Sequence, residues 1–255
     1  MKRLDVAARR DRIIALLSEE GELSAAELSG RLAVSVQTIR ADLRELDGAA
    51  LVQRRNGAAR LRQQSENIGY LPRESVSRQE KRRIALAVKN LIPDGARVAL
   101  GTGTTVEQCA RLLAARENLF VATNSIHAVC ALQNAPGAVV ELAGGSVRMR
   151  DLDMIGIAAH AFFANFRVDY AVFSCGGLSP DGAVMDYNSD EISARKAIAG
   201  CANTTILVAD TEKAGLDLAC RHAHLWDYDV IVTGAQLPAD VRRACAQRSC
   251  RLLRV

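Results

Sequence analysis

Glycine and hydroxyl residues follow the apolar run at residues 96–100 and precede a segment with helical spacing. The loop contains Gly101, Gly103, Thr104 and Thr105. A strand that ends in such a loop and opens a helix directs backbone N–H groups, the positive end of the helix dipole and hydroxyl groups to one point. This arrangement suits a phosphate group. A tight strand-to-helix turn that binds nothing is the alternative that the loop alone leaves open.

Small, polar or charged residues also follow other apolar runs. Runs near residues 97–100, 119–123, 139–143, 168–174, 205–209, 229–233 and 251–254 alternate with helical patterns. This alternation predicts a mostly parallel sheet covered on both faces, in which ligands bind at the carboxyl ends of the strands. Besides the first loop, the residues expected at those ends are Asn124, Ser125, Gly144, Gly145, Gly176, Gly177, Asp210 and Lys213. They predict an anion-binding pocket, although structural turns remain the alternative for each Gly-Gly pair.

The N-terminal residues carry a helix-turn-helix pattern. Ser24-Ala25-Ala26-Glu27 is a capping box and predicts a helix from Ala25 to about Ala33. Ser35 is expected to cap the next helix, which buries apolar side chains on one face and leaves a polar face for other contacts. The polar face carries Gln37, Thr38, Arg40, Ala41 and Arg44.

A basic hairpin is expected after these helices. Asn56-Gly57 separates two short extended runs, and such a pair favours a tight hairpin turn. Residues 49–62 contain four Arg and no acidic residue. A basic hairpin behind a helix-turn-helix forms a wing suited to DNA phosphates. The alternative is a small three-helix domain whose third helix and hairpin only face solvent.

Composition and length place the chain among ordinary globular proteins. Its 255 residues are 49% hydrophobic and 24% charged, and its net charge of +4 does not identify a partner. We expect a DNA-binding domain at residues 1–62, a linker at 63–77 and an α/β domain at 78–255, which begins with a second capping box at Ser77-Arg78-Gln79-Glu80.

The compartment and the absence of metals follow from other features of the composition. The start of the chain lacks the apolar core of a signal peptide, no apolar run reaches the length of a membrane span, and the seven Cys form no Cys-x-x-Cys pair. We therefore expect a cytoplasmic protein with reduced thiols. We expect no metal site and no cofactor, including at His222 and His224, which flank Ala223.

The first domain resembles a known family. Residues 33–46, followed by Arg55-Asn56-Gly57-Ala58, resemble the winged helix-turn-helix signature of the DeoR family of bacterial transcriptional regulators. The chain departs from that signature at Ala41, where the family usually has a second Arg, and at Asn56, where it often has His-Gly. The missing Arg predicts a changed operator affinity or sequence preference. The candidate DNA-binding residues are Ser35, Gln37, Thr38, Arg40, Arg44, Arg54, Arg55 and Arg60.

The second domain also resembles that family. Its landmarks are residues 80–85, the Gly-Thr-Thr loop, residues 123–125, Gly144-Gly145, the region 186–195 with Glu191, and residues 208–210 with Lys213. The DeoR-type effector domain is similar to the Rossmann-like α/β fold of sugar-phosphate isomerases and glucosamine-phosphate deaminases. The resemblance implies an effector site made of Gly101, Gly103, Thr104, Thr105, Asn124, Ser125, Gly144, Gly145, Glu191, Asp210 and Lys213.

Each part of a sugar phosphate has an implied partner in this site. The phosphoryl group would contact residues 103–105, Ser125 and Lys213, while Asp210 and Glu191 would face the sugar hydroxyls. The family commonly has Ser before the Lys. Glu212 in that position predicts weaker phosphate binding or altered selectivity.

The two domains together predict a transcriptional regulator. We expect a homo-oligomer, a dimer or a tetramer, that represses carbohydrate-metabolism genes from operator DNA and is released by a phosphorylated sugar. The alternative is that the regulator activates those genes. The alternative function is a sugar-phosphate isomerase-like enzyme with an appended DNA-binding domain. Its candidate bases are Asp153, Asp186, Glu191 and Asp210.

Overall fold

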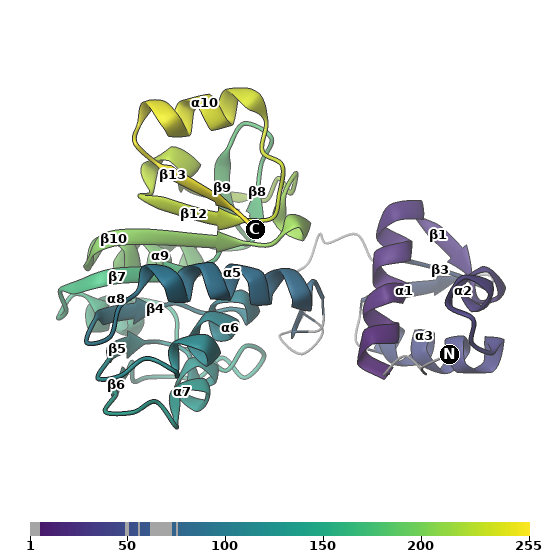
Figure 1. The fold of residues 1–255 in the computed structure, drawn as a ribbon, viewed down its shortest axis with the longest axis horizontal. Helices are drawn as coiled ribbons and strands as arrows, with labels where there is room; N and C mark the ends of the chain where they lie inside the picture. The colour runs from purple at the N-terminus through teal and green to yellow at the C-terminus, as the bar shows by residue number, and fades with distance from the viewer. Residues whose placement is uncertain (1–5, 49–50, 56, 62–72, 75) are drawn as a thin grey trace. The chain divides into compact units, whose positions relative to one another are not determined.

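The chain folds into two compact units, residues 1–78 and 79–255. Figure 1 shows a computed structural model, which describes residues 6–48, 51–55, 57–61, 73–74 and 76–255. Most of the predicted linker, residues 63–72 and 75, lies outside the described residues, as does Asn56 of the predicted hairpin turn. Each unit is described here by itself.

The N-terminal unit is a winged helix-turn-helix, as predicted. Its elements are α1 (Val6–Glu20), β1 (Glu22–Ser24), α2 (Ala25–Leu32), α3 (Val36–Gly48), β2 (Val52–Arg55) and β3 (Ala58–Leu61). The strands form an antiparallel sheet in the order β1-β3-β2. Ile13, Leu17, Leu28 and Ile39 are fully or almost fully buried between the helices and this sheet.

Local capping positions α2 and α3. The Glu27 N–H donates to Ser24 Oγ at 3.2 Å and the Ser24 N–H donates to Glu27 Oε2 at 2.7 Å, so the first capping box is confirmed. Ala33 has φ +52 and ends α2 one residue earlier than predicted. Ser35 caps α3, since its Oγ accepts a hydrogen bond from the Thr38 N–H at 3.1 Å.

The C-terminal unit is built on a parallel sheet of seven strands in the order β13-β12-β10-β7-β4-β5-β6. All neighbouring strands in it are parallel. The strands are β4 (Arg97–Leu100), β5 (Phe120–Thr123), β6 (Val139–Leu142), β7 (Val168–Phe173), β10 (Ala202–Ala209), β12 (Val230–Thr233) and β13 (Arg251–Arg254). Each lies where an apolar run predicted a strand. Because all seven run in one direction, their carboxyl ends lie along a single edge.

Helices cover both faces of this sheet, as Figure 1 shows. The helices are α5 (Arg78–Leu91), α6 (Thr104–Leu113), α7 (Ile126–Leu132), α8 (Ile157–Phe163), α9 (Ser189–Gly200) and α10 (Ala239–Gln247). Ile84, Val106 and Leu132, from α5, α6 and α7, share a core with Val98 and Leu100 of β4. Phe163, Ile198 and Val241, from α8, α9 and α10, share the other core with Ala99. Alternate residues of β4 thus enter opposite cores.

A small antiparallel sheet was not predicted. It consists of β8 (Gly177–Leu178), β9 (Ala183–Asp186) and β11 (Cys220–His224), in the order β11-β9-β8. A Cβ on Gly176 would lie 2.9 Å from Asp186 Oδ1, and one on Gly177 would lie 2.6 Å from the Leu216 carbonyl oxygen. These close approaches favour the structural alternative for this Gly-Gly pair.

The predicted capping box at Ser77 to Glu80 is wrong. Ser77 has φ +54, whereas an N-cap residue is normally extended. Glu80 Oε1 instead accepts hydrogen bonds from the Thr211 N–H at 2.8 Å, the Thr211 hydroxyl at 2.9 Å and the Gly234 N–H at 3.1 Å. Glu80 therefore connects the start of α5 to the loops after β10 and β12.

Candidate effector pocket and DNA-reading surface

The predicted DNA-reading side chains lie on the outer face of α3 and on the wing. On α3, Gln37, Arg40 and Arg44 are exposed, whereas Ile39 and Leu43 are buried on the other face. Residues 37, 40 and 44 are spaced by three and four positions and so share one face. This polar face can lie in a major groove.

The cap of α3 engages two of the predicted DNA-binding residues. The Ser35 and Thr38 hydroxyl oxygens lie 2.9 Å apart, in addition to the capping hydrogen bond between these residues. Ser35 is exposed and Thr38 is half-buried. Their hydroxyl groups thus already have protein partners, which leaves the longer side chains of α3 better placed for base edges.

The wing presents three arginines. Arg54, Arg55 and Arg60 are all exposed, on β2 and β3. Arg60 Nη2 donates to Gln53 Oε1 at 2.8 Å, which fixes its guanidinium across the hairpin. Gly57 has φ +84, the left-handed conformation that the predicted turn needs.

Asp42 anchors α3 against α1. It is 2% exposed, and Arg10 Nε donates to its Oδ1 at 3.0 Å while Arg9 Nη2 donates to the same oxygen at 3.1 Å. An ionised buried carboxylate needs such partners. The two arginines therefore hold the reading helix in a fixed orientation on its own unit.

The glycine-hydroxyl loop joins β4 to α6 as predicted. Gly103 has φ +111 and precedes α6, and the backbone there requires glycine. Thr104 and Thr105 form the first turn of α6 and are both buried. Gly101 packs closely against Phe173, because a Cβ on it would lie 3.1 Å from the Phe173 Cβ. The loop thus directs the N-terminus of α6 to the carboxyl edge of the sheet.

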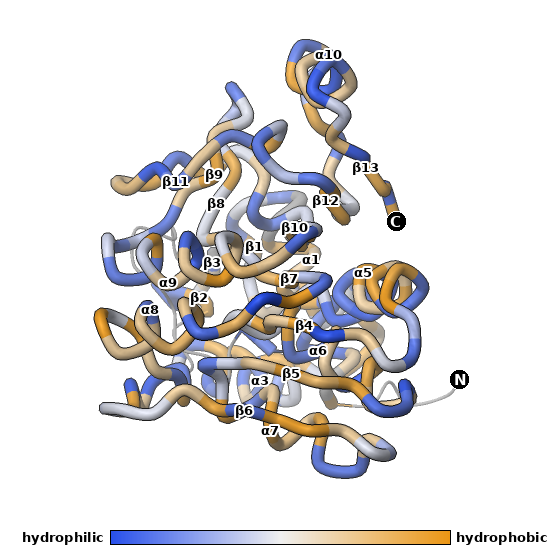
Figure 2. The backbone as a smooth tube through the Cα atoms, turned by 90° about the vertical axis from the view of Figure 1, so that its left-hand side faces the viewer, coloured by the Kyte–Doolittle hydropathy of each residue, from blue (hydrophilic) through white to orange (hydrophobic). Residues whose placement is uncertain are grey.

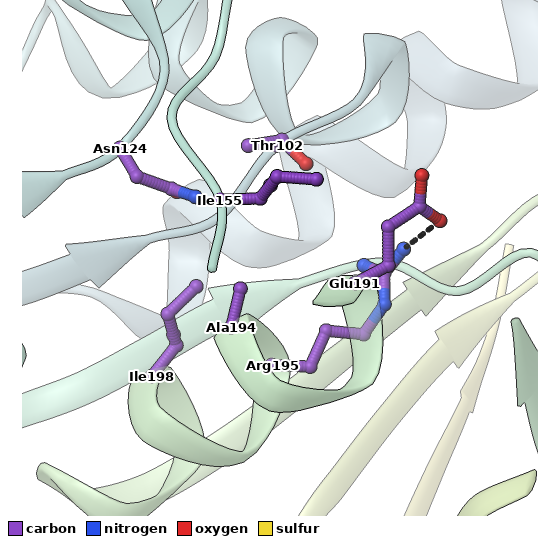
Figure 3. A pocket seen from close by; sticks show the side chains of 7 residues that line it. All are labelled: Thr102, Asn124, Ile155, Glu191, Ala194, Arg195 and Ile198. Carbon is purple, nitrogen blue, oxygen red and sulfur yellow. Dashed lines mark ion pairs between the residues drawn. The ribbon is translucent and has the colours of Figure 1, made fainter. Parts of the chain in front are cut away.

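A small pocket lies at this edge (Figure 3). Asn124, directly after β5, donates from Nδ2 to the Met154 carbonyl oxygen at 2.7 Å. Its Oδ1 is buried in the pocket wall without a hydrogen-bond partner among the described residues. The lining residues are Thr102, Asn124, Ile155, Glu191, Ala194, Arg195 and Ile198.

The N-terminal half of α9 supplies the polar wall of the pocket. Asn188 caps α9 by accepting a hydrogen bond from the Glu191 N–H at 3.0 Å. Residues 191, 194, 195 and 198 all line the pocket, and this is the spacing of one helical face. Figure 3 shows Glu191 and Arg195 as an ion pair, with Nη2 of Arg195 3.8 Å from Oε2 of Glu191.

Two arginines organise the buried carboxylates around the pocket. Arg148 donates from Nη1 to Glu191 Oε1 at 2.7 Å, and from Nε and Nη2 to the two oxygens of Asp153 at 2.9 and 2.7 Å. Arg195 donates to both oxygens of Asp186 and to the Ser174 carbonyl oxygen. Bidentate pairs of this kind fix both partners in position.

The arginines act differently on the pKa values of two carboxyl groups. Burial opposes ionisation of Glu191, but the charges of Arg195 and Arg148 and the hydrogen bond from Arg148 outweigh it and lower the pKa to about 2. Burial raises the pKa of Asp186 to about 6, although Arg195 acts in the opposite direction. Glu191 is therefore held as a carboxylate and hydrogen-bond acceptor.

A second cluster lies at the end of β10. Lys81 Nζ is 3.6 Å from Asp210 Oδ2, and both side chains are 3% exposed. The other oxygen, Asp210 Oδ1, is buried without a hydrogen-bond partner among the described residues. Burial, Asp210 and Glu80 raise the pKa of Glu212, in the turn that also carries Lys213.

The two clusters lie along the same edge of the sheet. Strands β10, β7, β4 and β5 are adjacent in the sheet, so Asp210 and Asn124 follow strands three places apart. Cys175, after β7, lies between them: burial raises the pKa of its thiol to about 12, and the charges of Asp186, Arg195, Lys213 and Asp210 all act on it.

The predicted effector residues fall into three groups. Asn124 and Glu191 line the pocket, and residues 101–105 flank it through Thr102. Asp210 and Lys213 are in the second cluster. Ser125 caps α7, since its Oγ accepts a hydrogen bond from the Ala128 N–H at 3.2 Å. Gly144 and Gly145 are exposed after β6 and are not among the residues that line the pocket.

Arg148 was not predicted, and Lys81, Thr102 and Arg195 fall in predicted segments but were not among the predicted site residues. Lys81 precedes Ile84, Ala85 and Val88 at helical spacing, so it lies on the buried stripe of α5. A lysine on an apolar stripe was the signal that could have revealed it. The position of Arg148 had no comparable signal, because its partner Glu191 is 43 residues away.

Among the described residues, no helix has both the length and the apolar composition needed to cross a membrane.

Comparison with known proteins agrees with this architecture. Residues 9–65 match the sequence model of the DeoR-like helix-turn-helix domain, and residues 76–235 match that of the DeoR C-terminal sensor domain. The chain is 34% identical to the HTH-type transcriptional repressor CsqR of Escherichia coli (strain K12), over 92% of this chain and 90% of the relative. It is 35% identical to the glycerol-3-phosphate regulon repressor of Haemophilus influenzae, over 89% of this chain and 88% of that one.

Solved structures with a related arrangement include ribose 5-phosphate isomerase from Plasmodium falciparum. That structure has 14% sequence identity and a TM-score of 0.37, over 52% of each chain. The two sequence models and the relatives that align over most of both chains decide the assignment. The chain belongs to the DeoR family of transcriptional regulators, with a DNA-binding winged helix-turn-helix and a DeoR-type sensor domain.

Proposed function

We propose that this regulator is a repressor that binds operator DNA through α3 and the wing and is released when a phosphorylated sugar occupies the sensor domain. The observation that carries the proposal is a pair of buried acceptor atoms, Asn124 Oδ1 and Asp210 Oδ1, both without hydrogen-bond partners among the described residues. A buried acceptor left unsatisfied costs about 1–3 kcal/mol. Hydroxyl groups of a bound sugar would satisfy both.

The surrounding groups suit the phosphoryl end of the same ligand. The Gly103 loop opens α6, whose first N–H groups and dipole favour an anion. Lys81 and Lys213 supply positive charge beside Asp210. The name of the relative from Haemophilus influenzae includes glycerol-3-phosphate, which is a small phosphorylated polyol. A phosphorylated sugar or polyol therefore matches both halves of the site.

Several features favour a sensor over an isomerase. A general base near neutral pH needs a pKa close to the working pH, and the pKa of Glu191 is lowered to about 2. Asp153 is fully buried and accepts two hydrogen bonds from Arg148, so it already has a cation as its partner. The pKa of Asp186 is raised to about 6, but this side chain is fully buried, accepts hydrogen bonds from Arg195 and is not among the residues that line the pocket. These carboxylates are arranged to hold positions, and we propose that the chain is not an enzyme.

Calorimetric titration of the full chain tests the sensor. The panel pairs each sugar phosphate, and glycerol 3-phosphate, with its unphosphorylated form. We expect one phosphorylated compound to bind and its unphosphorylated form to bind at least about 100-fold more weakly, because two or more charge-assisted hydrogen bonds are lost. Equal affinity for both forms would reject the phosphate site. Turnover of a bound sugar phosphate far above background would support the isomerase alternative.

A further inference from the structure

Two cysteines enclose the turn that joins the last helix of the sensor domain to its last strand. Cys245 belongs to α10 and Cys250 directly precedes β13, and their side chains are 0% and 5% exposed. All seven cysteines of the chain are free thiols. The four residues between this pair, 246–249, are all exposed. The two thiols are therefore buried beneath a single turn at the surface.

The geometry of this turn places the two side chains next to each other. The Cys250 N–H donates to the Cys245 carbonyl oxygen at 2.9 Å, and the Ser249 N–H donates to the Ala246 carbonyl oxygen at 3.4 Å. Ser249 has φ +59. These features define a Schellman motif, in which the first and last residues commonly pack side chain against side chain. Cys245 and Cys250 occupy those two positions.

The distance between the two cysteines fits a disulfide. The 2.9 Å hydrogen bond, with the standard bond lengths from each of its atoms to its own Cα, limits the Cα–Cα distance to at most about 6.8 Å. Cysteines can be bridged without backbone movement only when their Cα atoms lie within about 7 Å. The two thiols also hydrogen-bond to each other, so the sulfur atoms already face one another.

The two thiols differ in acidity. Burial raises the pKa of Cys250 to about 12, and Cys245 and Asp229 act in the same direction. Burial also raises the pKa of Cys245, but the hydrogen bond from Cys250 lowers it. The Cys250 S–H is thus the donor and the Cys245 sulfur the acceptor. Because the thiolate is the reactive form, Cys245 is the attacking group of the pair.

We propose that Cys245 and Cys250 form a redox site, which hydrogen peroxide converts into a disulfide between α10 and β13. The Cys245 thiolate attacks a peroxide oxygen, so that an S–O bond forms, the O–O bond breaks and hydroxide leaves. The Cys250 thiolate then attacks the Cys245 sulfur, so that the S–S bond forms and the S–O bond breaks with loss of a second hydroxide. The protons of the two thiols convert both hydroxides to water, and two electrons pass to the peroxide.

The position of the pair in the fold gives the oxidant access. Among the described strands, β13 pairs only with β12, and Figure 2 shows it at the margin of the sheet. Segments at an edge open locally at a lower free energy than the central strands do. Opening of the turn exposes both thiols together. Cys175, by contrast, follows β7 in the middle of the sheet, and exposed Cys130 has no thiol partner among the described residues.

The disulfide would stabilise the sensor domain without entering either binding surface. It closes a loop of six residues, 245–250, which lowers the equilibrium constant of unfolding by up to about 40-fold in the chain-entropy model. Neither cysteine lines the pocket, and α3 belongs to the other unit. We therefore expect unchanged operator affinity. The inference does not depend on the proposed function.

Peptide mapping of the full-length folded protein tests the site. The protein is treated with hydrogen peroxide, its remaining thiols are blocked with N-ethylmaleimide, and it is digested with trypsin. Because trypsin cleaves after Arg248, the two cysteines fall on separate peptides, 244–248 and 249–251. We expect these two peptides to be joined in the main disulfide product, and dithiothreitol to separate them. Cys130→Ser is the matched control and should keep this product, whereas Cys245→Ser should lose it.

Urea denaturation followed by Trp226 fluorescence tests the consequence, with an expected decrease of about 10–40-fold in the equilibrium constant of unfolding after oxidation. The proposal is overturned if Cys130 is oxidised while peptides 244–248 and 249–251 remain separate, or if either peptide is joined equally often to other cysteines. An unchanged urea midpoint of the bridged protein would reject the stabilising role. The mapping of the wild type decides the question even if Cys245→Ser does not fold.

Discussion

Replacement of Arg148 by Met tests the network that positions the pocket. The variant keeps an aliphatic side chain but removes the cation shared by Glu191 and Asp153, whose side chains are 7% and 0% exposed. Loss of one partner from a buried ion pair costs about 3–5 kcal/mol. Arg148 is 22% exposed, so solvent screens part of that loss, and we expect the free energy of unfolding to fall by about 2–4 kcal/mol.

Urea denaturation followed by fluorescence of Trp226, the only Trp, reports on the sensor domain. Arg150→Met is the matched control, because Arg150 is 43% exposed and contacts Asp151. The control should lose less than about 1 kcal/mol. Asp153→Asn removes the negative charge that Arg148 compensates. The double variant, Arg148→Met with Asp153→Asn, should therefore have a free energy of unfolding about 1–3 kcal/mol higher than the two single losses would give when added. Equal losses for Arg148→Met and Arg150→Met would refute the reasoning.

Three further predictions concern the DNA-reading surface, the pocket and pH. Arg40→Ala should weaken operator binding about 10–100-fold and Arg54→Ala should lower the salt slope by about 1, whereas Arg12→Ala, on α1, should change neither in fluorescence anisotropy. Asn124→Ala removes the unsatisfied acceptor, so calorimetry should show about 10-fold weaker effector binding with the fold unchanged; unaltered affinity would exclude Asn124 from the site. Burial, with Arg195 and Lys196, lowers the pKa of His222 to about 4, below its unfolded value of 6.5. The folded state therefore favours the neutral imidazole, and the free energy of unfolding that depends on it is fully present above pH 6.5 and is lost as the pH falls toward 4. His222→Asn should remove about 1–2 kcal/mol of that pH dependence, after allowance for solvent screening, and an unchanged profile from pH 7 to 4 would contradict this.

The sequence predicted those helices and strands whose apolar pattern and capping residues match the contacts that they make in the folded chain. The parallel strands are buried on both faces and therefore appear as continuous apolar runs, as in Val98-Ala99-Leu100. The capping residues Ser24 and Ser35 identified the starts of α2 and α3. Asn124 was found because it follows an apolar run expected to be a parallel strand, and such residues meet at one edge of the sheet. Glu191 was found only through the resemblance to the DeoR-type effector domain.

Other features depend on contacts that no local pattern encodes. The strand β8 has only two residues, and Gly176 before it and Gly177 within it serve close packing against Asp186 and Leu216. Ser77-Arg78-Gln79-Glu80 has the residue types of a capping box, but Glu80 instead accepts hydrogen bonds from Thr211 and Gly234. Arg148 reaches Glu191 only because the segment between β6 and α8 lies beside the start of α9. Tertiary structure decides the role of each of these residues.

Release of operator DNA by a phosphorylated sugar tests the central claim most directly. DNA from upstream of the chain's own gene is labelled, saturated with the full-length protein and titrated with the panel of phosphorylated and unphosphorylated sugars, with anisotropy as the readout. We expect specific binding that one phosphorylated compound reverses and its unphosphorylated form does not, and we expect Asn124→Ala to shift that release to higher concentration. Specific binding that no phosphorylated compound changes, or that the unphosphorylated form reverses equally well, would contradict the account.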